Sequence, residues 1–464
     1  MPTPSVSRRS VPFHPGDAGI ETSPCAGSPG ETGRSAPGPL QLSGADRRSG
    51  SARIESVYCM TSSGDDAPVC RARSARPRSG RRAVYSGRPR RAARRLALMD
   101  QNPKKTRAEG VDATNRDTIR YDQVEKTQTY RFAEGAGAEA FDESFRVRTC
   151  DIGRFLRGDE RDKRAFADEL GAALREIGFA ILAGHGIAPE LFERAEREVD
   201  RLFTAHSLEE KLRFRAARHG SVNQGYFPLE ETSDIHPDLV EGWVFCRRAF
   251  DFGDDSARPP RIADFWPDPA AEAVFRALCR AQMELVLPVV QSMLRSLGCD
   301  PHLYDERLAR PAIGLRLNYY PPVESADGVL NPRAGRLLGH EDVDLFTLLP
   351  APRSEGLQVL NRANFKWIRL DAPPDTIILN TGDYMQRISN DIFPSTTHRV
   401  SQPRDPELRR RHRVSFPMNV YLREDELLEV LPGTGAPKYE PIRALEFHTR
   451  TTAKYYGDDY AVTD

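Results

Sequence analysis

The stretch GHEDVDLFTLLP, residues 339–350, combines strand-like alternation with two potential metal ligands. Residues i and i+2 of a β-strand point to the same face, so the side chains of His340 and Asp342 are expected to converge on one ion. A second strand that pairs nearby could supply a third ligand, and His398 in STTHRV is the candidate. Taken alone, a His-x-Asp pair more often marks polar residues on an amphipathic strand, so the neighbouring motifs decide its meaning.

The potential ligand set indicates a particular kind of metal site. Two imidazoles and one carboxylate leave further coordination positions open, which is the pattern of non-haem Fe(II) oxygenases. The seven cysteines form neither a CxxC pair nor an even framework, which argues against a structural zinc site and a disulfide scaffold. This use of cysteine is typical of a reducing compartment, and we expect a cytoplasmic protein.

The C-terminal third of the sequence reads as short strands separated by turn residues at intervals of about 8–15 residues, which predicts a sandwich or a jelly-roll barrel. The preceding part reads as helical. KRAFADELGAALREI places four apolar residues on one helical face before Gly178, a helix stop signal. A longer helical stretch over 268–297 should be kinked or split by Pro288, and a last helix is expected around Pro441 to Tyr456. The predicted fold class is therefore α+β.

A candidate anion clamp lies downstream of the metal motif. Arg413 and Ser415 in RVSFP are again an i, i+2 pair, and a guanidinium and a hydroxyl on one strand face can bind a small carboxylate. Arg413 could equally belong to the basic run 409–413 on a solvated face. Upstream, RLNYYPP places Asn318 and Tyr320 on one face, where they could bind an anion or simply end a polar aromatic strand.

The formal net charge of zero averages two different parts of the chain. Residues 1–110 hold 20 Lys and Arg against 9 Asp and Glu, whereas the other 354 residues hold 47 against 58. Residues 1–98 are rich in Ser, Pro, Gly and Arg and show no periodicity. We expect them to be disordered because they bury too little apolar surface to offset the entropy of ordering. Residues 99–144 are expected to form a polar leader.

Three interpretations of residues 1–98 stay open. Translation could begin at Met99, the segment could be a plain disordered tail, or it could be a basic arm for nucleic acid or another polyanion. A transit peptide is disfavoured by the seven acidic residues of the segment. No run of 18 apolar residues occurs in the chain, so no membrane-spanning helix is predicted.

Six motifs occur in an order that resembles the isopenicillin N synthase-like branch of the Fe(II)/2-oxoglutarate-dependent dioxygenases. They are RLNYYPP, GHEDVDLFTLL, GLQVLN followed by a Trp, TGDYMQRISND, STTHRV and RVSFPMN. The upstream IGFAILAGHGI and QGYFPLE resemble that family's N-terminal helical region. The resemblance implies a double-stranded β-helix, a distorted jelly roll, flanked by helices. It divides the body into a mainly helical region, 145–300, and a jelly-roll core with a C-terminal helix, 301–464.

The resemblance also implies roles for particular residues. Three of them would hold Fe(II), namely His340, Asp342 and His398. Four would bind 2-oxoglutarate, namely Arg413 and Ser415 at its distal carboxylate, with Tyr320 and Asn318 in support. The implied reaction is oxidation, most often hydroxylation, of a small-molecule substrate by O₂, with release of succinate and CO₂. The chain departs from the family in the insertion PRDPELRRRH, although the RVSFP context favours Arg413 over the arginines of that insertion.

Two alternatives to this function stay open. The synthase that names the branch uses O₂ without 2-oxoglutarate, and Arg413 and Ser415 would then hold a substrate carboxylate. A catalytically silent binding module would instead use the barrel as a scaffold.

Four residues are candidates for contact with the substrate, namely Arg316, Phe346, Tyr226 and Trp243. Arg316 shares strand parity with Asn318 and could meet an acidic group. Phe346 shares parity with the metal ligands but fits a core position better. We expect a monomer that acts on a small metabolite, with no membrane partner, and with no nucleic-acid partner unless the basic tail is translated.

Overall fold

The structure is a computed structural model that describes residues 119–123, 126–130, 140–219, 222–229, 238–253, 261–325, 328–329 and 335–456. The tail predicted over 1–98 lies outside the described residues, as does most of the leader predicted over 99–144. Within that leader, β1 (Ile119–Gln123) pairs antiparallel with β2 (Lys126–Tyr130).

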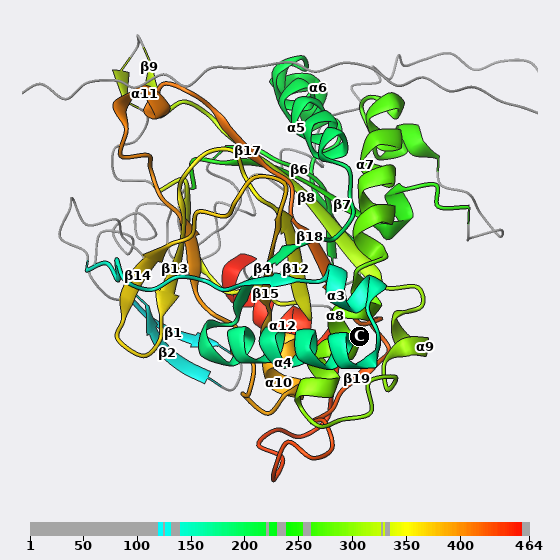
Figure 1. The fold of residues 1–464 in the computed structure, drawn as a ribbon. Helices are drawn as coiled ribbons and strands as arrows, with labels where there is room; N and C mark the ends of the chain where they lie inside the picture. The colour runs from blue at the N-terminus through cyan, green and yellow to red at the C-terminus, as the bar shows by residue number, and fades with distance from the viewer. Residues whose placement is uncertain are drawn as a thin grey trace, which may run out of the picture. The chain divides into compact units, whose positions relative to one another are not determined.

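Ten strands form the larger of two sheets in the core (Figure 1). They are β3 (Thr149–Asp151), β4 (Phe179–Ala183), β5 (Ala217–His219), β6 (Val222–Phe227), β7 (Glu241–Cys246), β8 (Ala312–Tyr320), β12 (Phe346–Pro350), β15 (Ile377–Thr381), β17 (Arg413–Ser415) and β18 (Met418–Tyr421). Neighbours follow the order β3-β4-β15-β12-β18-β8-β7-β6-β5, and β17 also pairs with β8. The strands pair antiparallel, except that β3 runs parallel to β4. Strands from the mainly helical region predicted over 145–300 thus extend a sheet whose centre comes from the C-terminal part.

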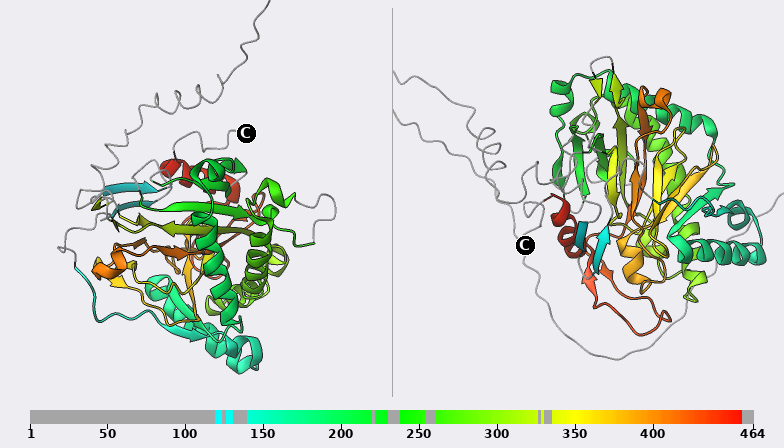
Figure 2. Two further views of the ribbon diagram at one scale, coloured as in Figure 1. Left: turned by 90° about the horizontal axis from the view of Figure 1, so that it is seen from above. Right: turned by 90° about the vertical axis from the view of Figure 1, so that its left-hand side faces the viewer.

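Four strands form the smaller sheet, in the order β11 (Leu337–His340), β16 (His398–Val400), β13 (Leu357–Asn361) and β14 (Lys366–Arg369). Residues of both sheets line one cavity, so the sheets enclose it between them. Figure 2 shows the same strands from two further sides. This arrangement is the predicted jelly roll, and it places the C-terminal half of the chain around an enclosed space.

The helices of the described residues are α3 (Gly153–Arg157), α4 (Glu160–Ile177), α5 (Pro189–Thr204), α6 (Leu208–Leu212), α7 (Pro269–Met283), α8 (Val286–Ser296), α9 (Asp305–Leu308), α10 (Asp383–Ile388), α11 (Pro406–Arg409) and α12 (Ala444–Tyr456), with short 3₁₀ turns η1 (Arg247–Ala249) and η2 (Ile262–Asp264). Of these, α4 packs against β3 and β4 of the larger sheet, and α5 packs against β8 and β17. Two small ribbons, β9 (Glu324–Ser325) with β10 (Gly328–Val329) and β19 (Leu427–Leu428) with β20 (Ile442–Arg443), complete the described elements. Among the described residues, no helix is both long and apolar enough to cross a membrane.

Helix α4 forms where its apolar periodicity predicts. The side chain of Asp159 caps its first turn by accepting hydrogen bonds from the backbone of Arg161 and Asp162. The predicted apolar face is buried, and α4 packs on α8. The helix ends at Gly178, whose φ of 71° is accessible to glycine at little cost. Gly178 therefore turns the chain directly into β4, which joins the sheet.

The helical stretch predicted over 268–297 is split, as expected, into α7 and α8. The break falls at Glu284 and Leu285, and Pro288 lies in the first turn of α8. A proline is tolerated there because the backbone N–H groups of a first helical turn have no intrahelical partner. The expected C-terminal helix is α12.

Candidate active site

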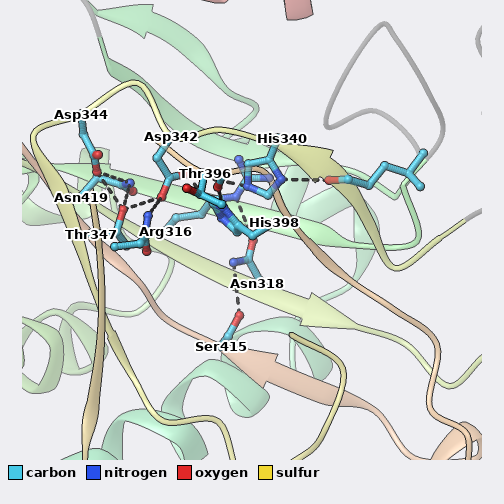
Figure 3. Close-up of polar contacts among 12 residues, drawn as sticks. Arg316, Asn318, His340, Asp342, Asp344, Thr347, Thr396, His398, Ser415 and Asn419 are labelled. Carbon is cyan, nitrogen blue, oxygen red and sulfur yellow. Dashed lines mark hydrogen bonds and ion pairs between the residues drawn. The ribbon is translucent and has the colours of Figure 1, made fainter. Parts of the chain in front are cut away.

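Three potential metal ligands come together between the two sheets. His340 ends β11, His398 begins β16, and the two residues pair directly across these strands. Asp342 Oδ1 lies 3.8 Å from His340 Nε2 and 3.9 Å from His398 Nε2. One ligand atom from each residue lies within 4.8 Å of the other two. Figure 3 shows the three side chains turned toward one another, an arrangement that can hold one divalent ion.

Backbone carbonyls orient both imidazoles. His340 Nδ1 lies 2.9 Å from the carbonyl oxygen of Leu338, and His398 Nδ1 lies 3.1 Å from that of Thr396. A carbonyl only accepts hydrogen bonds, so each Nδ1 carries the proton and each Nε2 keeps a free lone pair. Both free nitrogens face Asp342 Oδ1, as metal ligands with this kind of outer support do.

Asp342 does not lie within a strand, which corrects the prediction. Strand β11 ends at His340, and β12 begins only at Phe346. The orientation of the Asp342 carboxylate is set by hydrogen bonds and not by the alternation of side chains along a strand. Its Oδ2 accepts from Thr347 Oγ1 at 2.6 Å and from Asn380 Nδ2 at 2.8 Å. These two bonds occupy Oδ2 and leave Oδ1 directed at the two imidazoles.

A second buried aspartate, Asp344, extends this network. Its Oδ2 lies 2.8 Å from Thr347 Oγ1 and accepts a hydrogen bond from Asn419 Nδ2, also at 2.8 Å. Burial, together with the charge of Asp342, raises the pKa of Asp344 well above its ordinary value. A protonated Asp344 can donate a hydrogen bond to the oxygen of the Thr347 hydroxyl. Thr347 then donates its own single hydroxyl proton to Asp342.

Gly382 allows the chain to approach these aspartates closely. A Cβ atom at Gly382 would lie 2.1 Å from Asp344 Oδ1 and 2.8 Å from the backbone oxygen of Asp342. The next residue, Asp383, donates its backbone N–H to that same oxygen at 2.8 Å. The Gly382-Asp383 turn therefore fixes the loop that carries Asp342.

The pKa shifts favour metal-binding protonation states. Burial, followed by the electrostatic effect of the neighbouring His398, lowers the pKa of His340 to about 4. Burial alone would raise the pKa of Asp342, but the two imidazoles and the hydrogen bonds from Thr347 and Asn380 hold it below its ordinary value. At neutral pH His340 is therefore neutral and Asp342 ionised, which are the forms that bind a metal.

Arg413 and Ser415 lie on β17 and face the predicted partners on β8. Arg413 pairs with Tyr320, and Ser415 pairs with Asn318. The guanidinium of Arg413 lies 4.9 Å from the centre of the Tyr320 ring, and Asn318 Nδ2 donates to Ser415 Oγ at 3.4 Å. All four side chains line the cavity that contains the potential metal ligands. The structure thus brings the predicted clamp and the predicted metal cluster into one cavity.

The guanidinium of Arg413 fits a carboxylate ligand. Arg413 is 3% exposed, and its Nε and Nη1 have no hydrogen-bond partner among the described residues. Burial lowers its pKa, because the charged form has lost water that no protein anion replaces. A buried cation without a counter-ion is costly, and a small dicarboxylate would supply that anion.

The insertion before Arg413 does not compete for this role. It contains the short helix α11, and Arg409 pairs with Glu324 while Arg410 pairs with Glu407. Neither of these arginines nor Arg411 lines the cavity, which leaves Arg413 as the arginine of this run that does.

Of the four substrate candidates, Arg316 alone lines the cavity. Tyr226 and Trp243 pair across β6 and β7 but pack into the aromatic core against Phe203. Their sequence neighbours Phe227 and Val244 face the cavity instead, because successive side chains of a strand alternate between its faces.

Phe346 is likewise a core residue with no exposed surface, and its neighbour Thr347 faces the cavity. Phe346 does not share a strand face with His340, although this was expected, because the chain leaves the strand conformation between the two residues. The two supports of Asp342, Thr347 and Asn380, were not predicted. Thr347 stands in the quoted GHEDVDLFTLLP motif as a polar residue within an apolar run, and that contrast could have indicated it.

Comparisons with known proteins identify the family of the chain. Residues 147–269 match a family model described as the N-terminal region of a non-haem dioxygenase in morphine synthesis, and residues 314–418 match the 2OG-Fe(II) oxygenase superfamily. A 2-oxoglutarate-dependent dioxygenase of Monascus ruber, citB, is 30% identical over 279 residues, which cover 55% of this chain and 80% of the relative. Isopenicillin N synthase of Streptomyces griseus is 28% identical over 270 residues, covering 55% and 79%.

A solved structure shows the same fold. A Neurospora crassa protein, solved at full length in complex with alpha-KG and thymine, superposes with a TM-score of 0.58 and 26% identity, covering 68% of this chain and all of that one. The chain therefore belongs to the Fe(II)/2-oxoglutarate-dependent dioxygenases, in the branch that includes isopenicillin N synthase. It is an oxidoreductase whose reaction requires Fe(II), 2-oxoglutarate and O₂, as the motifs predicted. Its family membership also disfavours the alternative of a silent binding module.

Proposed function

We propose that this enzyme hydroxylates a small metabolite and couples the reaction to conversion of 2-oxoglutarate to succinate and CO₂. His340, Asp342 and His398 would hold Fe(II), because their three free ligand atoms face one point. Thr347 and Asn380 would orient Asp342 without contacting the metal. When bound, Fe(II) and 2-oxoglutarate supply the oxidising power with O₂, whereas the side chains bind, orient and exclude water.

The observation that carries this proposal is that the guanidinium of Arg413 is only partly satisfied by hydrogen bonds. It lies in the same cavity as the metal ligands, is almost fully buried, and leaves Nε and Nη1 without a partner among the described residues. Arg413 would bind the distal carboxylate of 2-oxoglutarate. Ser415 would donate its hydroxyl proton to the same group, because its oxygen already accepts a hydrogen bond from Asn318.

The cavity supports a small substrate. Its volume is about 220 Å³, below the roughly 300–1,000 Å³ of typical ligand sites, and 2-oxoglutarate would occupy part of it. We further propose a monomer that acts in the cytoplasm. The cysteines among the described residues are buried and free of disulfides, which is compatible with a reducing compartment.

The proposal is tested by incubating the Fe(II)-loaded enzyme with 2-oxoglutarate, ¹⁸O₂ and a panel of metabolites. Hydroxylation predicts stoichiometric succinate and one ¹⁸O atom in the oxidised metabolite. The Arg413→Gln variant is expected to lose both products. A wild-type enzyme that oxidises a metabolite without forming succinate would contradict the proposal and favour the isopenicillin N synthase type of reaction.

A further inference from the structure

A second cation, Arg316, lies in the cavity beside the metal cluster. Arg316 is half-buried on β8, two residues before Asn318. Its Nε donates to Asn318 Oδ1 at 2.8 Å. Within the described part of the chain, its other guanidinium nitrogens make no hydrogen bond or ion pair. Four guanidinium N–H donors therefore lack a protein acceptor there.

Arg316 is displaced from the Arg413 clamp along the barrel wall. On β8, Tyr320 faces Arg413, Asn318 faces Ser415, and the backbone N–H of Arg316 bonds to Pro417. The four residue-to-residue steps from Arg316 to Tyr320 correspond to roughly 13 Å along a strand. An anion held at Arg413 would thus leave Arg316 available for another group.

The guanidinium of Arg316 has a defined position close to the metal cluster. Its charge contributes to lowering the pKa of His340, so the two groups lie within electrostatic reach. The guanidinium lies against Gly242 on the neighbouring strand β7, where a Cβ would be in ordinary van der Waals contact, 3.4 Å from Arg316 Nη2. Figure 3 shows Arg316 and Asn318 beside the two imidazoles. Asn318 thus orients Arg316 with its amide oxygen and Ser415 with its amide nitrogen.

The described protein residues supply no counter-ion for Arg316. Two further acids line the cavity, but Asp238 accepts a hydrogen bond from the backbone of Leu338 and Glu341 accepts one from Thr397. Neither forms an ion pair with Arg316 in the described part of the chain. A partly desolvated guanidinium beside a reaction centre and without a protein anion is suited to an anionic ligand.

We propose that Arg316 binds a carboxylate of the primary substrate, so that the substrate is a small carboxylic acid with an apolar body. This inference rests on the proposed function, because it assigns the Arg413 clamp to 2-oxoglutarate. The apolar body would contact the apolar part of the cavity wall, which includes Phe179, Phe227, Val244, Leu349 and Leu357. The carboxylate at Arg316 would hold one end of this body and present a neighbouring C–H bond to the metal.

The test compares acids with their uncharged amides. The Fe(II)-loaded, 2-oxoglutarate-bound enzyme is titrated anaerobically with 3-phenylpropanoate, hexanoate and the two corresponding amides, by calorimetry. We expect at least one acid to bind about tenfold or more tightly than its amide, as a charged hydrogen-bonded pair predicts. Arg316→Gln should abolish this difference, and Arg316→Lys, which keeps the charge, should restore part of it.

The affinity for 2-oxoglutarate identifies which carboxylate Arg316 binds. Arg316→Gln should change the 2-oxoglutarate dissociation constant by no more than about twofold, whereas Arg413→Gln should weaken it strongly. If Arg316→Gln weakens 2-oxoglutarate binding as much as Arg413→Gln does, Arg316 belongs to the co-substrate site and the inference is wrong. It is also wrong if no acid outcompetes its amide on an enzyme that binds 2-oxoglutarate normally. If the wild-type enzyme fails to bind 2-oxoglutarate at all, the proposed function itself fails.

Discussion

Replacement of Arg413 by Gln should separate ligand binding from stability. The guanidinium is 3% exposed, stacks on Tyr320, and has two nitrogens without a partner in the described structure. Bound 2-oxoglutarate would supply about two charge-assisted hydrogen bonds. Loss of one member of such a buried pair costs roughly 2–5 kcal/mol, so the dissociation constant should rise about 30- to several-thousand-fold.

The same substitution should cost the ligand-free protein little. Removing a desolvated cation that has no anion relieves an unfavourable burial, while losing the stacking on Tyr320 forfeits about 0.5–2 kcal/mol. These effects oppose each other, so the free energy of unfolding without ligand should change by no more than about 1 kcal/mol. Calorimetric titration of 2-oxoglutarate, with Mn(II) in place of Fe(II), and urea denaturation measure the two quantities.

Arg387 provides a matched control for this experiment. It is also a buried arginine stacked on aromatic rings, those of Tyr439 and Phe447, but it donates to the carbonyl of Glu440 and lies outside the cavity. Arg387→Gln should lower the free energy of unfolding by about 1–3 kcal/mol and leave 2-oxoglutarate binding unchanged. If Arg413→Gln behaves like Arg387→Gln, the guanidinium of Arg413 is structural and the reasoning is refuted.

Three further predictions concern the metal cluster. Thr347→Val removes a hydrogen bond to Asp342 and should weaken Fe(II) binding about 10- to 100-fold in a chelator competition assay. Gly382→Ala should destabilise the protein by about 2 kcal/mol or more and weaken Fe(II) binding, because its Cβ would meet Asp344 at 2.1 Å; an unchanged melting temperature would contradict this. In metal-free protein, burial and the electrostatic effect of the neighbouring His398 lower the pKa of His340 to about 4, so the folded state binds this proton less readily than the unfolded state. The free energy of unfolding should therefore fall by roughly 3 kcal/mol as the pH drops from about 6.5 to about 4, and denaturation of His340→Gln should show that this dependence is lost.

The alternation of side chains along a strand predicted which residues of β8 and β17 lie on one face, because both strands are regular at these residues. Asn318, Tyr320, Arg413 and Ser415 lie on uninterrupted strands, so residues two apart share a face. The same rule did not place Phe346 on the face of His340, because the chain leaves the strand conformation after His340.

The sequence marks Thr347 as a polar residue within an apolar run, but it does not show which groups Thr347, Asn380 and Asn419 contact. Thr347, Asn380 and Asn419 come from β12, β15 and β18, and their side chains meet only because these strands pair in the sheet. Tyr226 and Trp243 were misassigned because aromatic residues suit both a cavity and a core, and only the packing of α5 on the sheet shows which face they occupy.

The most direct test of the account is an anaerobic titration of the purified enzyme with Fe(II) and then 2-oxoglutarate. We predict a metal-to-ligand charge-transfer absorption band that saturates at one Fe(II) and one 2-oxoglutarate per chain. The band should be absent in His340→Ala at the same concentrations. A wild-type protein that binds both components and shows no such band would contradict the claim that His340, Asp342 and His398 hold an iron to which 2-oxoglutarate binds.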